Sequence, residues 1–420
     1  MQLNRHVFIR GALAAAAGTA LNGAAHATQP VDSWKVDSAL LYYSEQDRVS
    51  VTEPVIYATR QVNEDKSYTL HLIYDSMTGA TPNGAAPSAQ TQTITSASGG
   101  SLTVAPGKLP VKSFSDHREA FGIDWTNNTS RLVKRSSSLN VSKETDYASL
   151  GGNLSYSIDS ANRMSTYTGG VGVSLDLVQP KGGAPVGMQS IAVTNTSASG
   201  GEGFSGERKN TVDLMIGTTQ VLSRRSLLQI NLAHSLISGY LSDPYKVESL
   251  VDTTGLPTGY VWEKRPDRRN ANIFYTKWVY HLPEDVIHLS YRYFQDDWGI
   301  RSHTADLTYH LMLPRQLYLE PHFRYYTQTQ ANFYHTSLPD WQALPSYASA
   351  DYRLAEMNSR TAGIKLGIPV GSDSEVSLRY EKMVQRGNEH PADAIGTQQS
   401  LNLYPGLNAT IMQITFTTLF

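Results

Sequence analysis

The sequence contains no cysteine in 420 residues, which excludes a disulfide framework. Charge is also sparse, because 17% of the residues are charged and the net charge is -2. Such a balance argues against a nucleic-acid partner, which would require a basic face. Beyond residue 27 there is no apolar run long enough to be a transmembrane helix. Stability must therefore come from burial and from closed backbone pairing.

The first residues are typical of a cleaved export signal. Arg5 and Arg10 supply the positive region, and residues 11–20 form a short apolar run rich in alanine. The pattern Ala25-His26-Ala27 suits signal peptidase, so we expect cleavage after Ala27. The run is too short to span a bilayer, and the segment has neither an Arg-Arg pair nor a lipoprotein cysteine. We expect residues 1–27 to be a signal peptide and residues 28–420 to be the exported domain.

Apolar and polar residues alternate with a period of two along most of the chain, which predicts β-strands. Residues 286–293 show this most clearly, since Leu289 and Tyr291 point one way while His288 and Ser290 point the other. Residues 304–311 repeat the pattern. The apolar face is broad and carries aromatic residues toward the strand ends. The polar face mixes small, hydroxyl and charged residues. This combination favours the lipid-out, lumen-in faces of a membrane barrel over a soluble sandwich.

The lengths of the connections support the same architecture. The connections form two sets that alternate along the chain: one set is very short, and the other contains every long connection. A barrel with short periplasmic turns, long outer loops and both termini in the periplasm has this arrangement. Residues 80–107 and 182–206 are of low complexity, and we expect neither to fold by itself. Pro54 and the runs near Val51 and Leu132 fit strands poorly. The connections that we expect to be long are 76–116, 179–208, 239–269, 329–357 and 385–408.

These patterns predict an all-β fold: a transmembrane antiparallel β-barrel of about sixteen strands in the outer membrane of a Gram-negative bacterium. The last strand carries Met412, Ile414 and Phe416 on one face and ends on Phe420. A terminal aromatic residue on an alternating strand resembles the signal that barrel assembly machinery recognises. We therefore expect membrane lipid and this machinery to be partners of the chain.

Ionisable residues gather on the expected inner face of neighbouring strands. They could line an aqueous pore, or form a structural ion-pair network that closes the barrel. A metal or catalytic site is less favoured, because the histidines lack compact ligand spacing and the sequence has no strained G-x-S-x-G turn. We assign no catalytic, cofactor or metal residue. The candidate lumen-lining residues are His281, His288, Arg292, Asp306, His310, Glu320, His322, Arg324, Arg379 and Glu381.

Four acidic residues lie in expected outer loops, where aspartate favours turns because it bonds its own backbone. Calcium binding at the barrel rim is an alternative interpretation. Trp298 follows two of these residues, and we expect it near the membrane interface. The four are Asp243, Asp267, Asp296 and Asp297.

Several segments resemble an uncharacterised proteobacterial outer-membrane family, domain of unknown function 3570. The most specific is Tyr291-Arg-Tyr-Phe-Gln-Asp-Asp-Trp-Gly-Ile-Arg-Ser-His-Thr304. The resemblance implies an outer-membrane barrel and transfers no catalytic residue. The other matching segments are 75–85, 217–222, 239–246, 265–268, 318–326 and 351–354.

Two functions remain open from the sequence. The first is a porin-like channel for small solutes or ions, because barrels of this strand number can leave an aqueous channel. The second is a closed barrel that binds a periplasmic partner protein as a scaffold in an envelope redox or cofactor-handling system. That second possibility is hinted at by the resemblance alone. We expect neither enzymatic activity nor a cofactor.

Overall fold

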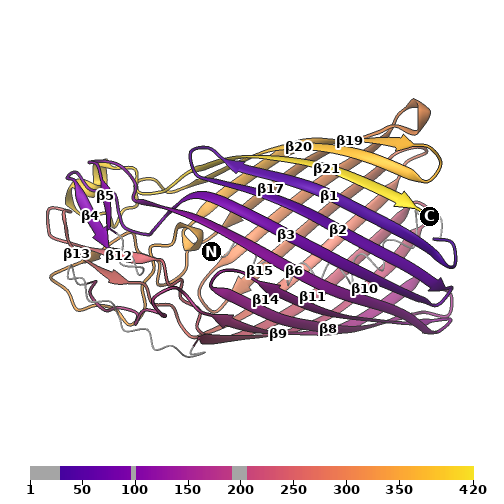
Figure 1. Ribbon diagram of the computed structural model, residues 1–420, viewed down its shortest axis with the longest axis horizontal. Coiled ribbons are helices and arrows are strands. Elements are labelled where there is room, and N and C mark those ends of the chain that lie inside the picture. The colour runs from indigo at the N-terminus through magenta and orange to yellow at the C-terminus, as the bar shows by residue number, and fades with distance from the viewer. Residues whose placement is uncertain (1–28, 96–100, 192–205) are drawn as a thin grey trace.

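The computed structural model describes residues 29–95, 101–191 and 206–420, and within them sixteen antiparallel strands close into one barrel (Figure 1). The predicted fold class and strand number are confirmed. The expected signal peptide and its cleavage site lie outside the described residues. The barrel strands are β1 (Ser33–Glu45), β2 (Val49–Asn63), β3 (Lys66–Pro82), β6 (Val111–Ser130), β7 (Val133–Lys143), β8 (Tyr147–Asp159), β9 (Ser165–Val178), β10 (Glu207–Ser223), β11 (Ser226–Gly239), β14 (Arg268–His281), β15 (Val286–Asp296), β16 (Arg301–Met312), β17 (Tyr318–Gln328), β19 (Met357–Val370), β20 (Ser374–Gly387) and β21 (Leu407–Leu419).

The first and last strands close the barrel. β1 pairs with β21 from Lys35 opposite Leu419 to Glu45 opposite Ala409. Two backbone hydrogen bonds extend this seam to the chain end: Trp34 N–H donates to Phe420 O at 2.6 Å, and Phe420 N–H donates to Trp34 O at 2.9 Å. The start of β1 and the end of β21 therefore lie at one end of the barrel. Recognition of Phe420 by assembly machinery stays a prediction.

The outer surface of the barrel is apolar. On β15, Leu289 is 45% exposed, and on β17 Phe323 is 48% exposed, while Ser302 and Thr304 on the opposite face of β16 are buried. An exposed apolar belt around a closed barrel is suited to lipid and not to water. Among the described residues, no helix is long and apolar enough to span a membrane. Exposed apolar residues from around the belt include Leu72, Leu150, Val173, Ile216, Leu232, Ile364 and Ile414.

The proline in β2 is accommodated by a break in one ladder. The β2–β3 register passes from Thr52 opposite Ser76 to Val55 opposite Ile73, so residues 53–54 are not paired with β3. Pro54 has no N–H to donate, which explains a gap at this point. On the other side it still lies opposite Leu40 of β1. The second strand is therefore continuous despite its proline.

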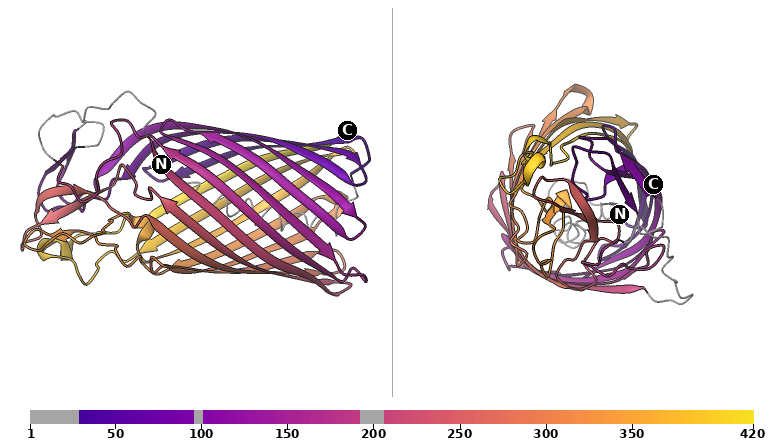
Figure 2. Two further views of the ribbon diagram at one scale, coloured as in Figure 1. Left: turned by 90° about the horizontal axis from the view of Figure 1, so that it is seen from below. Right: turned by 90° about the vertical axis from the view of Figure 1, so that its left-hand side faces the viewer.

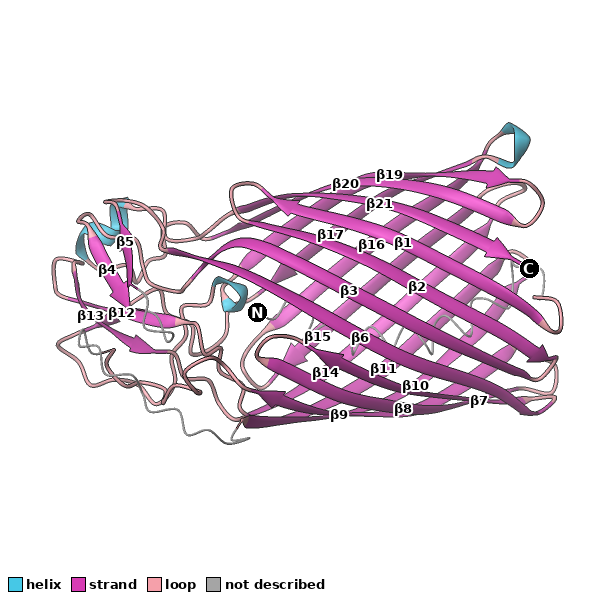
Figure 3. Cartoon of the chain, in the orientation of Figure 1, coloured by secondary structure: helices cyan, strands magenta, loops and turns pink. Residues whose placement is uncertain are grey.

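All long connections lie at one end of the barrel, opposite the tight turns (Figure 3). The expectation that one set contains every long connection is confirmed, and the connections 46–48, 144–146 and 297–300 at the same end are short. Asp296 stabilises the last of these, since its Oδ1 accepts from Trp298 N–H at 3.1 Å and Ile300 N–H at 2.9 Å.

The long loops form a roof over the barrel end, and in the end-on view they cross the opening (Figure 2). The described part of residues 80–107 packs on another loop, because Ile94 is buried with Ala85 against Val247. The low-complexity segment therefore folds by using apolar surface outside itself. The remaining elements are β4 (Gln92–Thr95), β5 (Ser101–Val104), β12 (Val247–Val251), β13 (Pro257–Trp262), β18 (Leu338–Pro339), and the 3-10 helices η1 (Pro314–Gln316), η2 (Tyr352–Leu354) and η3 (Gly396–Ser400).

Trp298 lies inside the mouth of the barrel, which corrects its expected position near the membrane interface. It is 3% exposed, and its ring meets Phe333 edge-on at 5.1 Å between centroids. Its Nε1–H donates to Arg268 O at 2.8 Å, and the Arg269 guanidinium stacks over its ring at 4.5 Å. The tight turn after Asp296 directs the indole inward. Trp298 thus anchors loop 329–356 to β14 and β15.

Arginine placed on the lipid face should destabilise the barrel. Ile216 on β10 is 64% exposed, and Ile216→Arg should lower the free energy of unfolding in lipid vesicles by about 2–4 kcal/mol if it lies near the midplane. Thr211→Arg on the same strand is the control, because Thr211 lines the interior cavity. Urea titrations followed by tryptophan fluorescence would measure both changes. Equal destabilisation by the two variants would contradict the assignment of faces.

Candidate functional site

The interior of the barrel contains a cavity of about 1560 Å³ beneath the loop roof. Its wall is formed by the inward residues of most barrel strands in their loop-proximal halves, and its upper boundary includes the loop residues Asp243, Tyr245, Asp351 and Arg353. Lysine, arginine, aspartate and glutamate are all represented on the wall. The cavity is therefore a polar chamber that membrane lipid does not reach.

The structure brings several of the sequence-predicted residues into one network at the cavity wall. His322 on β17 lies between two carboxylates: its Nε2 is 3.0 Å from Asp306 Oδ2 on β16, and its Nδ1 is 2.9 Å from Glu381 Oε1 on β20. Arg379 Nη1 lies 3.7 Å from the same Glu381 oxygen. Arg324 is directly opposite Asp306 in the register of β16 and β17. These contacts join side chains from the three strands β16, β17 and β20.

A second network lies nearer the short turns. His310 Nδ1 is 2.9 Å from Glu320 Oε1, and Lys365 Nζ is 3.3 Å from Glu320 Oε2. The His310 ring packs against Tyr318 at 4.5 Å between centroids. Sequence reasoning missed Lys365, although its place in an alternating strand is the signal that could have identified it.

The remaining predicted residues lie at other positions along the lumen. His281 lies at the end of β14, where its Nδ1 is 2.6 Å from Leu282 O and its ring is exposed. His288 is half-buried on β15 and its Nδ1 has no hydrogen-bond partner among the described residues. Arg292 lines the cavity one rung closer to the loops and stacks over Phe294 at 5.2 Å. The candidate set is thus divided over three levels of the lumen.

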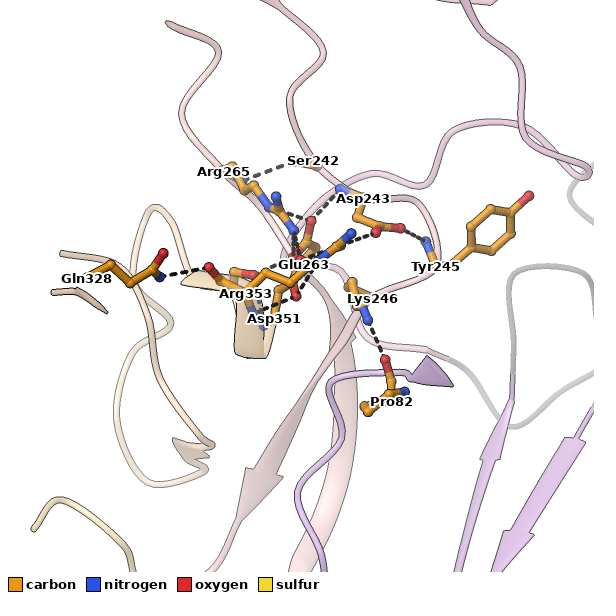
Figure 4. Close-up of polar contacts among 11 residues, drawn as sticks. Pro82, Ser242, Asp243, Tyr245, Lys246, Glu263, Arg265, Gln328, Asp351 and Arg353 are labelled. Carbon is orange, nitrogen blue, oxygen red and sulfur yellow. Dashed lines mark hydrogen bonds and ion pairs between the residues drawn. The ribbon is translucent and has the colours of Figure 1, made fainter. Parts of the chain in front are cut away.

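The most extensive ionic contacts are in the roof, and the sequence analysis did not predict them (Figure 4). Six buried or half-buried residues of two loops form what we call the loop clamp. Its acidic members are three carboxylates and its basic members are two arginines and one lysine, so the cluster is electrically balanced. They are Asp243, Lys246, Glu263, Arg265, Asp351 and Arg353.

The loop clamp joins loop 240–267 to loop 329–356. Arg265 Nη2 lies 2.8 Å from Asp351 Oδ2, and its Nε lies 2.8 Å from Glu263 Oε1. Arg353 Nη2 lies 2.8 Å from Asp243 Oδ2 and 2.5 Å from Asp351 Oδ2. Lys246 donates to the carbonyl oxygen of Pro82, which brings the end of β3 into the same unit.

The charges of the loop clamp stabilise one another in a buried environment. Burial opposes ionisation of Asp351, but Arg353 and Lys246 hold the pKa of its carboxyl well below its usual range. For Asp243, burial likewise opposes ionisation, but Arg353, Lys246 and Arg265 together lower the pKa to about 2. A buried ion pair is costly to break because it leaves an uncompensated charge. The loop clamp therefore favours one arrangement of the roof.

The acidic loop residues were predicted to lie in turns, and the structure shows this for Asp243 together with contacts that the sequence did not predict. The predicted turn is confirmed, because its Oδ1 accepts from Tyr245 N–H at 3.1 Å. Its other carboxylate oxygen contacts Arg353, a residue 110 positions away. Asp296 is likewise paired, with Arg269 Nη2 at 2.5 Å, and Asp297 accepts from Asn270 Nδ2 at 2.7 Å. The described residues contain no group of three or more suitable side chains for a metal ion.

A family model matches residues 10–418 of this sequence. The chain belongs to the family described as Protein of unknown function (DUF3570). The resemblance seen in the sequence is thereby confirmed. In this family member, segments 239–246, 265–268 and 351–354, on which the resemblance rested, supply Asp243, Lys246, Arg265, Asp351 and Arg353 to the loop clamp. The matching segments thus meet in space at the mouth.

The solved structures that this family member matches are outer-membrane proteins of low sequence identity. OccK5 (OpdH) of Pseudomonas aeruginosa is 8% identical with a TM-score of 0.40, and the match covers 92% of this chain and 98% of that one. OccAB2 of Acinetobacter baumannii is 10% identical with a TM-score of 0.43, over 92% and 98% of the chains. A mutant ferric enterobactin receptor (PfeA) of P. aeruginosa is 8% identical with a TM-score of 0.43, over 92% and 60%. No curated protein matches.

Glu248 is a buried acid in the roof without a cation partner. It lies on β12, is fully buried, and neither carboxylate oxygen has a hydrogen-bond partner among the described residues. Burial, together with the nearby Glu263, raises the pKa of Glu248 well above its usual range. A protonated carboxyl at this position avoids placing an unpaired charge in the roof.

Removal of one charge from the loop clamp should loosen the roof. Asp351→Asn leaves Arg265 and Arg353 without a shared carboxylate, and roof opening should become easier by about 3 kcal/mol. Limited proteolysis should then cleave within residues 329–356 much faster while the barrel stays folded. Asp340→Asn, at an exposed position in the same loop, is the control. Unchanged cleavage of Asp351→Asn would show that the loop clamp does not hold the roof.

Glu248 should make the roof less stable as the pH rises. Because its folded-state pKa is raised, its stabilising contribution is complete below the unfolded pKa of about 4.3 and is lost as the pH rises through the folded pKa. Glu248→Gln cannot ionise, so proteolytic resistance of the roof should depend less on alkaline pH. The exposed loop residue Glu356, changed to Gln, serves as control. Identical pH profiles for wild type and Glu248→Gln would refute this role.

Proposed function

We propose that this protein is a porin-like channel through which small polar solutes or ions cross the outer membrane passively. The observation that carries the proposal is the polar cavity of about 1560 Å³ inside a closed sixteen-strand barrel. Small-molecule pockets usually measure about 300–1,000 Å³, so this volume can hold a small solute with its water. Charged side chains on the wall can replace part of the hydration shell of a solute.

The roof supports selection by size. The loop clamp ties two loops together above the cavity, and the apolar cluster around Trp298 anchors loop 329–356 to the rim. Both sets of contacts hold loop residues at the mouth, so a solute would enter between them. A roof fixed in this way favours small solutes over large ones.

Single-channel recording would test the channel directly. The mature chain, refolded and inserted into a planar bilayer, should give stable conductance steps that increase with salt concentration. Asp351→Asn should give less stable steps, because its roof is held less firmly, while Asp340→Asn should behave as wild type. A silent bilayer containing folded, inserted protein would contradict the channel and favour a closed barrel that binds a periplasmic partner.

A further inference from the structure

Three cationic side chains occupy one sector of the cavity wall. Lys277 on β14, Arg292 on β15 and Arg324 on β17 all line the cavity. The strand registers bring them together: Lys277 lies opposite Ser290, Ser290 opposite Asp306, and Asp306 opposite Arg324. Arg292 occupies the adjacent rung, opposite Thr304. We call these three residues and their surroundings the cationic sector.

The cationic sector contains more positive than negative charge. Asp306 is the carboxylate in the row of paired residues that runs from Lys277 to Arg324. Its Oδ2 already contacts His322 Nε2 at 3.0 Å. Among the described residues, no carboxylate oxygen lies within 4.0 Å of the Lys277 ammonium or the Arg324 guanidinium. Arg269, higher on the same wall, differs in having Asp296 at 2.5 Å. The half-buried Lys277 and Arg324 thus face the cavity with unused capacity to bind an anion.

Another part of the wall carries acidic and basic residues together. Asp116 lies on β6, Asp176 on β9 and Asp213 on β10, and all three line the cavity. β6 is fourth and β16 twelfth in the circle of sixteen strands, so they lie half the circumference apart. Asp176 is neutralised by Lys209 at 2.6 Å. Lys112, Arg118 and Lys209 line the cavity from β6 and β10, so the three acidic residues face an equal number of cations. The cationic sector, with three cations and Asp306, therefore attracts an anion more strongly than this part of the wall does.

Two tyrosines make the cationic sector suitable for an organic anion. Tyr275 on β14 lies opposite Arg292 on β15. On the other neighbouring strand of Arg292, Thr304 of β16 lies opposite Arg292 and, in turn, opposite Tyr326 of β17. Both tyrosines line the cavity. Their rings can contact a carbon skeleton while the cations hold a carboxylate, which arginine binds through paired N–H donors.

We propose that the cationic sector binds the carboxylate group of small organic anions, with Lys277 and Arg324 as the binding residues. This inference rests on the proposed function, because it names the class of solute that the channel would favour. A charged hydrogen bond to a carboxylate contributes enough that its loss weakens binding roughly tenfold.

Equilibrium binding of succinate to the detergent-folded protein tests the site. Wild type should bind succinate, and Lys277→Gln and Arg324→Gln should each bind roughly tenfold more weakly. Arg324→Lys should bind with an affinity between those of wild type and Arg324→Gln, because lysine keeps the charge but not the paired donors. Lys181→Gln is the matched control, because Lys181 is an exposed lysine at the cavity rim, in the loop after β9 and outside the cationic sector. Slower mobility after heating on gels would show that each variant is folded. Absence of succinate binding, or equal weakening by Lys181→Gln, would overturn the proposal.

Conductance separates this inference from the proposed function. Succinate should reduce the chloride current of wild type and of Lys181→Gln, but not that of Arg324→Gln. Succinate binding with a silent bilayer would leave the site established and refute the channel. Conductance steps without succinate binding would leave the channel established and refute the site.

Discussion

The structure depends on the need to pair every backbone N–H and C=O inside the hydrocarbon. Water is absent there, so a sheet that spans lipid must have no free edge. The pairing of β1 with β21 meets this requirement, and it also determines the facing of every side chain in the sheet. Once Leu289 faces lipid, His288 and Ser290 must face the lumen. The polar chamber is a direct consequence of closure.

The mouth is organised by two different kinds of interaction. Trp298 and Phe333 bring apolar surface to the rim, where its burial is non-directional and tolerates variation in loop length. The loop clamp is directional, because arginine presents its donors in a fixed fork. Burial of balanced charges contributes little net stability, but a misplaced loop would leave an unpaired charge in the roof. The apolar cluster attaches the loops, and the loop clamp selects their arrangement.

The barrel was predictable because its pattern is local. Alternation along 286–293 and 304–311 depends on the residues of each strand alone, so the faces of His322 and Arg324 followed from their neighbours. The position of Trp298 was predicted wrongly, because alternation ends at the turn and does not define the direction of a hairpin tip. Residues 80–107 were expected not to fold by themselves, and only the tertiary structure shows that Ile94 is buried against Val247 from a distant loop.

The sequence by itself determined the class of fold, the approximate strand number, the two faces of each strand and the end at which the long loops gather. Periodicity and turn chemistry encode these features within a few residues. The tertiary structure alone decided the loop clamp, the grouping of Lys277, Arg292 and Arg324 on one part of the wall, and the cavity that they line. Arg265 meets Asp351 across 86 positions, and Lys277 approaches Arg324 only through two intervening strands. Such proximity arises from closure of the barrel, which no local pattern records.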